Sequence, residues 1–403
     1  MSILEELNAP AVWEEFLRYK LDKNHLSSKE QEEWTAFIDN GDYRKVTEHL
    51  MEEDFTFSYP TKVCVNKSAT HKKRIVYSFA EEESMVLKCM AFLLYRYDDK
   101  ISRACYSFRR NCSAKDAMER ILTIPNLSGK YCFKADISNY FNSIPADKLL
   151  KVLQHVITDD EPLNAFLRKL LLAGKVYDNG NLVEEETGAM AGIPIAPFFA
   201  NIYLGSLDRL FEEKGIPYFR YSDDILFFAD TEAELADYQH LLEGHIQDKG
   251  LKLNPDKIAV TEPGESWDFL GFSYKSGKID LSEVTKNKLK AKIKRKAHSL
   301  YRWRLRNHAD FERTARAMIR TFNRKFYDDT DENRFTWSRW FFPVLSTDEG
   351  LKELDAYLVQ YIRYLSSGRH YKGNYRVSYE QIKELGFRSL VNEYYRSKLT
   401  DSI

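Results

Sequence analysis

The chain has 403 residues, of which 43 % are apolar and 30 % charged, and its formal net charge is −1. This composition is that of a folded globular protein and excludes a disordered one. No apolar run approaches the ~20 residues that cross a bilayer, and glutamates occupy the start of the chain where a secretory leader would be basic and then apolar. We therefore expect a protein of the cytoplasm without a membrane partner.

The first half of the chain predicts helices mixed with a few strands. Residues 1–60 hold 14 Asp/Glu against 6 Lys/Arg and indicate short acidic helices. Residues 61–79 alternate like two strands joined by a polar loop at 68–71. The other expected elements are a helix over 81–98, a buried strand over 130–137, and helices beginning at Pro145 and Pro197.

A hairpin follows, formed by the apolar runs PYFRY (217–221) and ILFFA (225–229). Further expected elements are a helix over 231–249, strands within 251–254, 257–262 and 267–274, and mostly helices from Leu281 onward. Strands mixed with helices, then helices alone, predict an α+β core with an appended α domain.

Residues 286–306 carry ten Lys/Arg and no acid. The apolar residues of this segment fall near one helical face, so the cations occupy the other faces. A basic amphipathic helix suits a nucleic-acid backbone, a membrane surface or plain solvent, and its own pattern does not decide between them. The cations that we single out as nucleic-acid contacts are Lys288, Lys292, Arg295, Lys296 and Arg302.

Three aspartates lie at the ends of apolar strands: Asp136 after the strand at 130–137, and Asp223 and Asp224 at the hairpin tip. Each has an ordinary explanation, because aspartate is common in turns and at helix caps. Three carboxylates from adjacent buried strands would, however, repel one another unless cations lay between them. Two Mg²⁺ ions ~4 Å apart would neutralise them and align an in-line phosphoryl displacement.

Ordered motifs over residues 60–345 resemble the bacterial reverse transcriptases of the group II intron and retron kind. In chain order the motifs are KKRIVYSF (72–79), ISRACYSFRRNCSAKDAM (101–118), FKADISNYFNSIP (133–145), GIPIAPFFANIYL (192–204), RYSDDILFF (220–228), LKLNPDK (251–257) with WDFLGF (267–272), and FNRKF with WSRWFFP (322–343). Each motif alone is weak, and their order makes the resemblance strong.

The resemblance implies a right-hand polymerase fold with an antiparallel palm sheet and a helical thumb. The expected parts are an acidic helical N-terminal region (1–60), fingers with part of the palm (61–128), palm (129–280), basic helical thumb (281–345) and a helical aromatic and basic C-terminal extension (346–403).

The resemblance also implies catalytic roles. Asp136, Asp223 and Asp224 would hold two Mg²⁺ ions, which Mn²⁺ can replace, with the Ile137 carbonyl as a further ligand. Lys257 would protonate or steady the leaving pyrophosphate, although a surface lysine would look the same in the sequence.

Substrate contacts follow in the same way. Arg74, with Lys67 or Lys73, would contact the β and γ phosphates, unless this cluster is a solvated strand end. Phe141 would lie beneath the sugar and exclude a 2′-hydroxyl, but the adjacent Tyr140 could do this instead, and either ring could belong to the core.

Other implied contacts lie further along the chain. Gly192 would let the backbone approach the nascent base pair, and Pro194 would stiffen that turn. Ala191 departs from the glutamine usual in the family, which puts nucleotide or template selection in doubt. Phe269 and Gly271 would grip the primer, although FLGF equally suits a buried strand.

The function implied is that of an RNA-directed DNA polymerase, a nucleotidyltransferase that uses dNTPs, an RNA template and a DNA primer. FTWSRWFFP and the tail from GRHYKGNY to NEYY resemble stand-alone reverse transcriptases of the "unknown group", linked to phage defence, which favours a dedicated structured RNA as template. Two alternatives stay open: an RNA-directed RNA polymerase, against which Phe141 and Y-S-D-D speak, and a maturase-like RNA-binding protein. The tyrosines after residue 345 could stack on unpaired bases or pack on the thumb.

Overall fold

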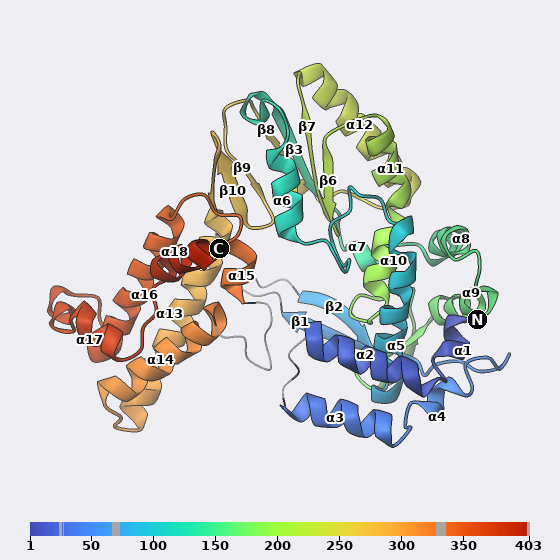
Figure 1. Cartoon of the computed structure of the whole chain (residues 1–403), viewed down its shortest axis with the longest axis horizontal. Coiled ribbons are helices and arrows are strands. Elements are labelled where there is room, and N and C mark those ends of the chain that lie inside the picture. The colour runs from blue at the N-terminus through green and yellow to red at the C-terminus, as the bar shows by residue number, and fades with distance from the viewer. Residues whose placement is uncertain (24–25, 27, 67–72, 328–335, 401–403) are drawn as a thin grey trace. The chain divides into compact units, whose positions relative to one another are not determined.

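The computed structural model describes residues 1–23, 26, 28–66, 73–327 and 336–400 (Figure 1). The chain divides into two units, Met1–Pro263 and Gly264–Ile403. No helix within the described ranges is both long and apolar enough to span a membrane. The finer division into fingers, palm, thumb and extension stays a prediction.

The first unit mixes helices with two four-stranded sheets, as an α+β fold requires. Its helices are α1 (Ile3–Glu6), α2 (Pro10–Lys23), α3 (Ser28–Asp39), α4 (Arg44–Thr47), α5 (Glu81–Leu93), α6 (Ala114–Leu122), α7 (Tyr140–Ser143), α8 (Ala146–Val156), α9 (Glu161–Leu171), α10 (Ala196–Tyr203), α11 (Gly205–Glu213) and α12 (Glu232–Asp248). Its strands are β1 (Thr61–Asn66), β2 (Lys73–Ser78), β3 (Tyr131–Asp136), β4 (Lys175–Asp178), β5 (Asn181–Glu184), β6 (Tyr218–Tyr221), β7 (Asp224–Ala229) and β8 (Ala259–Thr261).

The sheet that carries the aspartates has the strand order β6-β7-β3-β8 and is antiparallel throughout. Its central strands are mostly buried, with four of the six residues of β3 and five of the six residues of β7 almost inaccessible to solvent. On one face the Phe133 and Phe227 rings stack at 4.8 Å, and Phe211 from α11 and Tyr238 from α12 pack against Phe227. We call this sheet the palm sheet.

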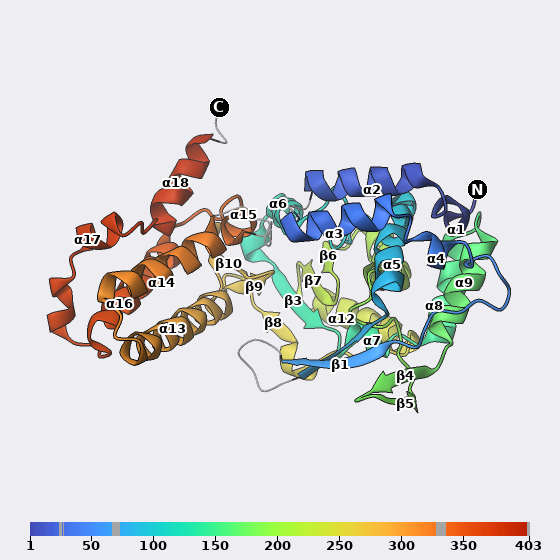
Figure 2. The ribbon, with the colours of Figure 1, turned by 90° about the horizontal axis from the view of Figure 1, so that it is seen from below.

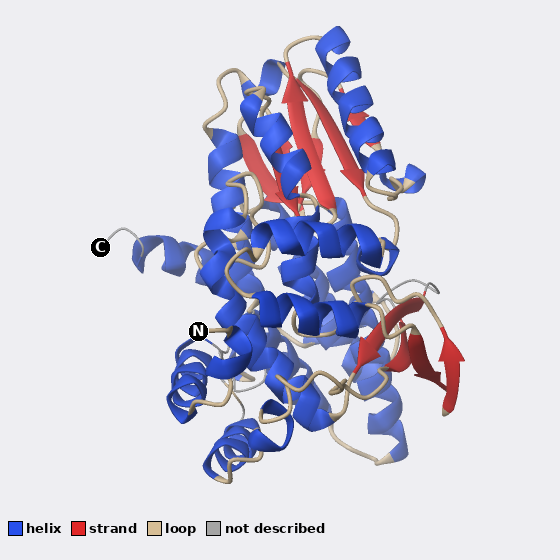
Figure 3. Ribbon diagram, turned by 90° about the vertical axis from the view of Figure 1, so that its right-hand side faces the viewer, coloured by secondary structure: helices blue, strands red, loops and turns tan. Residues whose placement is uncertain are grey.

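The second sheet of this unit has the order β2-β1-β4-β5, and Figure 3 shows it as a group of strands separated from the palm sheet by helices. The β1–β2 hairpin agrees with the expected strands; its predicted connecting loop at 68–71 lies outside the described residues. The β4–β5 hairpin was not among the expected elements. Its turn is Asn179-Gly180 with φ of 49° and 85°, the Asn-Gly signal that favours a tight hairpin.

Helices of the N-terminal region pack on α5, and Figure 2 shows α2 and α3 beside it. Aromatic side chains make this contact: Phe16 lies 5.2 Å from Trp34 and 5.6 Å from Phe92. The acidic residues therefore occupy the outer faces of helices whose inner faces join the main core.

Two expected elements differ in detail. The helix expected from Pro197 is interrupted at Leu204 and continues as α11. The segment LKLN is not a strand, since its only ladder contact in the described structure is the bridge between Leu253 and Ile137.

The second unit consists of a small antiparallel sheet, in the order β11-β10-β9, and a helical body. The basic helix α13 buries Leu289, Ile293 and Ala297, which recur every four residues along one face, and packs on α14 and α16. The elements are β9 (Trp267–Phe269), β10 (Phe272–Lys275), β11 (Lys278–Leu281), α13 (Glu283–Arg306), α14 (Phe311–Phe326), α15 (Trp337–Phe341), α16 (Glu349–Ser367), α17 (Tyr379–Glu384) and α18 (Leu390–Thr400).

Candidate active site

The palm sheet brings the three predicted aspartates together. Asp136, the last residue of β3, is the cross-strand partner of Asp224, the first residue of β7. Directly paired residues project from the same face of an antiparallel sheet, so the two carboxylates are neighbours. Asp223 precedes Asp224, and its carbonyl accepts a hydrogen bond from the Ile137 N–H at 3.2 Å.

A two-residue turn holds Asp223 at the hairpin tip. Ser222, the first residue of this turn, has a φ of 61°, in the left-handed region that a non-glycine residue adopts at a cost. Its N–H donates to the Ser107 hydroxyl at 2.8 Å, and its carbonyl accepts from the Arg220 guanidinium at 3.1 Å. These buried bonds stabilise a strained turn that carries a catalytic candidate.

Beneath this hairpin lies an ion pair that the sequence analysis missed. Arg220 of β6 and Asp208 of α11 are both 0 % exposed, and the guanidinium donates to the carboxylate at 2.7 Å and 2.5 Å. Tyr218 donates to the same carboxylate at 3.0 Å. An arginine within the apolar strand PYFRY is the signal that could have revealed the pair, since a buried charge requires a partner.

The pair extends into a hydrogen-bond network that reaches α10 and the segment 104–107. Arg220 also donates to the Asn201 carbonyl at 3.0 Å, and the Asn201 side chain binds Ser107 through its amide nitrogen and its oxygen. The backbone of Arg220 bonds to Ala104 and Tyr106 on the outer edge of β6. The β6–β7 hairpin is thus held by the ion pair with α11 and by backbone hydrogen bonds along the edge of β6.

Burial and mutual repulsion raise the pKa values of two of the aspartates. Burial, followed by the charge of Asp223, raises the pKa of Asp224 from 3.8 to about 6. Burial, followed by the charge of Asp136, raises the pKa of Asp223. The nearby cations Lys257 and Arg74 offset only part of the rise at Asp223. The site therefore concentrates negative charge that lacks a full counter-charge.

Lys257, the predicted partner of the leaving pyrophosphate, lies next to Asp136. Its ammonium donates to an Asp136 carboxylate oxygen, and this bond, acting against burial, raises the pKa of Lys257. The Asn254 N–H donates to the Asp136 carbonyl at 2.7 Å. The segment before β8 therefore positions a cation on the carboxylate cluster.

The donor set fits divalent cations. It is made of carboxylate oxygens, the ligands that Mg²⁺ and Mn²⁺ prefer, and the raised pKa values show negative charge that a cation would offset. Within the described ranges no three His, Cys, Asp or Glu side chains form a ready coordination sphere. At Asp136 the Lys257 ammonium occupies the position of a counter-ion.

The predicted nucleotide contacts lie on β2 and α7. Arg74 is exposed, and its guanidinium carbon lies 5.9 Å from the centroid of the half-buried Phe141 ring. Lys73 is exposed on the same strand, whereas Lys67 lies outside the described residues. The charge of Arg74 also lowers the pKa of Asp223, so Arg74 and the neighbouring Phe141 ring lie near the aspartates.

The structure separates Tyr140 from Phe141, which the sequence left undecided. Tyr140 is 2 % exposed, and its hydroxyl donates to the Ala200 carbonyl at 2.6 Å. It is a core residue. Phe141 is the ring that remains accessible beside Arg74.

Gly192 has a φ of 107°, and a Cβ there would lie 2.9 Å from the Tyr77 carbonyl oxygen. Glycine is therefore required at position 192 because a side chain would collide with the backbone of β2. The predicted approach of a base pair would be a second reason. Ala191 is 3 % exposed, and its carbonyl accepts from the Tyr77 N–H at 2.7 Å. Its small side chain fits between strand and loop. Pro194, half-buried, precedes α10.

The predicted primer contacts belong to the second unit. The Phe269 side chain is 0 % exposed, so the expectation that its ring grips a primer is wrong: the ring belongs to the core of this unit. Leu270 and Gly271, with φ of 51° and 90°, form the β9–β10 turn. The half-buried backbone of this turn is what a primer could contact.

The five cations predicted as nucleic-acid contacts lie on the accessible sides of α13. Lys288, Arg295 and Arg302 are exposed and recur every seven residues, while Lys292 and Lys296 are half-buried. Two other lysines of this helix, Lys286 and Lys290, pair with Glu353 of α16. The helix therefore separates cations that hold the unit together from cations available to a polyanion.

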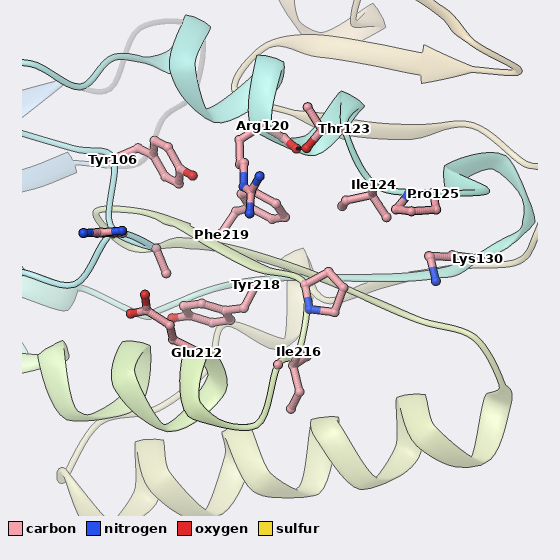
Figure 4. A pocket seen from close by; sticks show the side chains of 14 residues that line it. Tyr106, Arg120, Thr123, Ile124, Pro125, Lys130, Glu212, Ile216, Tyr218 and Phe219 are labelled. Atoms are coloured by element: carbon pink, nitrogen blue, oxygen red, sulfur yellow. Dashed lines mark hydrogen bonds between the residues drawn. The ribbon is translucent and has the colours of Figure 1, made fainter.

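A pocket of about 810 Å³ opens at the outer edge of β6, between α6 and the loop after α11 (Figure 4). Phe219 and Tyr106 stack in it at 6.0 Å. Its lining includes Arg120 and Glu212 but none of the three aspartates. It is thus separate from the candidate active site.

Residues 65–274, more than half of the chain, match the family model of the reverse transcriptase (RNA-dependent DNA polymerase). The chain belongs to this family. The palm sheet with its paired aspartates is accordingly that of a right-hand polymerase fold, as the sequence predicted.

Relatives of this chain agree with that assignment. The retron Ec86 reverse transcriptase of Escherichia coli is 22 % identical over 59 % of this chain and 69 % of its own. An uncharacterized 91 kDa protein in a cob intron of Schizosaccharomyces pombe is 28 % identical over 42 % of this chain. The match covers 20 % of that relative and likewise 20 % of an intron 2 protein of Saccharomyces cerevisiae, so the chain spans about a fifth of these two proteins.

Among solved structures, apo telomerase from Candida tropicalis aligns with a TM-score of 0.49 and 10 % identity, over 86 % of this chain and 65 % of that one. This is a distant likeness.

The buried ion pair predicts a large cost of breaking it on one side only. Asp208→Asn leaves the Arg220 charge buried without a counter-charge, which costs about 3–5 kcal/mol of unfolding free energy. Asp208→Leu combined with Arg220→Met removes both charges and should recover most of that loss. Thermal melts followed by circular dichroism measure both variants. An Asp208→Asn variant with the same melting temperature as the wild type would contradict the account.

The raised pKa of Asp224 predicts a pH-dependent stability of the metal-free protein. Because the folded state holds this proton more tightly than the unfolded state does, the contribution of Asp224 to stability falls as pH rises from about 4 to about 6. Asp224→Asn should therefore raise the free energy of unfolding more at pH 7.5 than at pH 5, by at most about 3 kcal/mol. Melts in EDTA measure this.

The control for the pH experiment is Asp237→Asn, an exposed aspartate of α12. A stability gain of Asp224→Asn that is the same at both pH values would contradict the assignment.

Proposed function

We propose that the protein is an RNA-directed DNA polymerase, a nucleotidyltransferase that extends a DNA primer on an RNA template with dNTPs. The observation that carries this proposal is the pairing of Asp136 with Asp224 beside Asp223, at one end of a palm sheet in a chain of the reverse transcriptase family. Related proteins named as retron reverse transcriptases support it. The chain covers only part of its intron-encoded relatives, so this activity is our inference.

In the proposed mechanism Asp136, Asp223 and Asp224 would hold two divalent cations, Mg²⁺ or Mn²⁺, with the Ile137 carbonyl as a further ligand. The bound cations would supply Lewis-acid stabilisation of the primer 3′-oxygen and of the triphosphate. Asp223 and Asp224 must be ionised to bind them, and the raised pKa of Asp224 makes binding weaken as pH falls toward 6.

Around the carboxylates, the side chains of the first unit bind and orient the nucleotide. Arg74 offers a planar two-point contact to phosphate oxygens, and the exposed Lys73 adds positive charge on the same strand. Lys257 pairs with Asp136 in the metal-free protein; once a cation binds to that carboxylate, the released ammonium would be able to protonate or steady the leaving pyrophosphate.

Phe141 would select deoxynucleotides. Its ring is accessible beside Arg74, so a sugar whose triphosphate contacts Arg74 lies within its reach. A ring in contact with C2′ leaves no space for a hydroxyl. Tyr140 cannot share this role, because it is buried and bonded to Ala200.

The template is proposed to be a dedicated structured RNA, and the setting anti-phage defence. The support is the sequence likeness of FTWSRWFFP and the GRHYKGNY tail to stand-alone reverse transcriptases. Sequencing of co-purified RNA tests the first part: one predominant RNA supports it, and random host RNA contradicts it. Phage plating on cells that carry wild type or Asp223→Asn tests the second, which fails if neither protects.

Loss of a carboxylate should abolish synthesis. Asp223→Asn is expected to lower incorporation of labelled dNTP on an RNA template with a DNA primer by about 10³-fold or more, because charge on the reacting oxygens is then poorly stabilised. Asp237→Asn is the matched control and should be active. Equal rates for wild type and Asp223→Asn would contradict the proposal, and a preference of wild type for NTPs would favour an RNA polymerase. RNA binding without any synthesis would favour a maturase-like role.

Truncating the sugar-selecting ring should relax discrimination. Phe141→Ala is expected to raise the use of NTPs relative to dNTPs by about tenfold or more, since it removes the steric barrier to the 2′-hydroxyl. Single-nucleotide incorporation with dTTP and UTP measures the ratio. Tyr140→Phe, which removes only a buried hydroxyl, should leave the ratio unchanged. An unchanged ratio in Phe141→Ala would show that another group selects the sugar.

A further inference from the structure

Three rings follow one another in the second unit, one pair stacked and the next pair tilted, outside the residues that match the reverse transcriptase family. His298 of α13 stacks on Tyr364 of α16 at 5.1 Å and 25°, and Tyr364 packs on His370 at 5.1 Å and 31°. We call His298, Tyr364 and His370 the ring stack. His298 and Tyr364 are half-buried, and His370, at the end of the stack, is exposed.

The loop after α16 is built to place His370 there. Gly368 ends the helix with a φ of 73°, and a Cβ at this position would lie 2.2 Å from the Tyr301 ring. Tyr301 donates its hydroxyl to the Ser367 carbonyl at 3.0 Å. The chain therefore turns tightly over Tyr301, and His370 returns to pack on Tyr361 at 4.9 Å as well as on Tyr364.

The surroundings of the ring stack are cationic. Burial, followed by the positive charge of Lys294, lowers the pKa of His298, and His370 and Arg302 act on that pKa in the same direction. Lys294, Arg302 and Arg369 are exposed. The three rings therefore lie next to exposed positive charge.

Two other tyrosines of this region have a different role. Tyr361 and Tyr394 are buried, and the Tyr394 hydroxyl donates to the Leu345 carbonyl at 2.8 Å. These rings pack in the core of the unit, as the helical spacing of the tyrosines allowed. Tyr371, 51 % exposed, follows His370 directly and extends the accessible aromatic surface.

We propose that the ring stack and its flanking cations bind a single-stranded segment of the RNA template, with an unpaired base on the exposed face of His370 and phosphates on Lys294, Arg302 and Arg369. This inference rests on the proposed function, from which the RNA identity of the strand is taken. An aromatic face binds any base, and cations beside it bind the backbone, so recognition is independent of sequence. A duplex hides its base faces and would gain only from the cations.

The test uses fluorescence anisotropy with the full chain and a labelled 12-nucleotide oligo(U), without dNTPs. His370→Ala should weaken binding about five- to tenfold through loss of one stacking contact. Arg302→Glu should weaken it by about tenfold at low salt and less at high salt. The matched controls are Tyr395→Ala, an exposed tyrosine on α18, and Lys383→Glu, an exposed lysine on α17; both should bind as the wild type.

A second probe separates stacking from charge. A 12-nucleotide RNA that lacks its bases should lose the effect of His370→Ala and keep that of Arg302→Glu. Equal effects of His370→Ala on both probes, or no effect on oligo(U), would overturn the base-stacking role. Tighter binding of oligo(dT) than of oligo(U) would overturn the assignment to template RNA.

Extension of a pre-annealed RNA–DNA hybrid by one nucleotide is measured alongside. Wild type should extend this short substrate, whose template strand leaves a single unpaired base beyond the primer. Absence of extension by wild type would overturn the proposed function itself. If wild type extends the hybrid and His370→Ala and Arg302→Glu bind oligo(U) as tightly as wild type, only this inference is overturned.

Discussion

The register between β3 and β7 is the constraint on which the site depends. It sets Asp136 opposite Asp224 and leaves Asp223 at the adjoining turn. A slip by one residue would turn one carboxylate to the opposite face of the sheet, among the rings of Phe133 and Phe227. The apolar faces of both strands make such a slip costly, so the core of the palm sheet holds together carboxylates that would otherwise move apart.

The buried acidic residues of the first unit differ in how their charge is balanced. Asp208 is completely buried and permanently neutralised by Arg220, in a network that binds the hairpin turn at Ser222. The three aspartates keep unbalanced charge, because the one ion pair that they make among the described residues joins Asp136 to Lys257, a half-exposed side chain. The first arrangement gives rigidity, whereas the second leaves a site whose charge an exchangeable cation can balance.

The strands and aspartates of the palm sheet could be predicted from the sequence more completely than the roles of the residues around them. The apolar strands and the three aspartates could be predicted because alternation, burial and the resemblance agree. Tyr140 and Phe141 could not be told apart, since adjacent aromatic residues differ only in which one faces the core. Phe269 fitted a primer contact and a buried strand equally, and burial decided for the strand. Arg220 was missed because its partner lies in another element, although a charge within an apolar strand was visible.

The central claim, that Asp136, Asp223 and Asp224 form one divalent-cation site for nucleotide transfer, is tested most directly by crystals grown with Mn²⁺, a primer–template hybrid and a non-hydrolysable dNTP analogue. The account predicts anomalous density for Mn²⁺ between these carboxylates, with Lys257 released from Asp136 and Arg74 on the triphosphate. Crystals that contain the analogue but show no Mn²⁺ at the aspartates, with Lys257 still bound to Asp136, would contradict it.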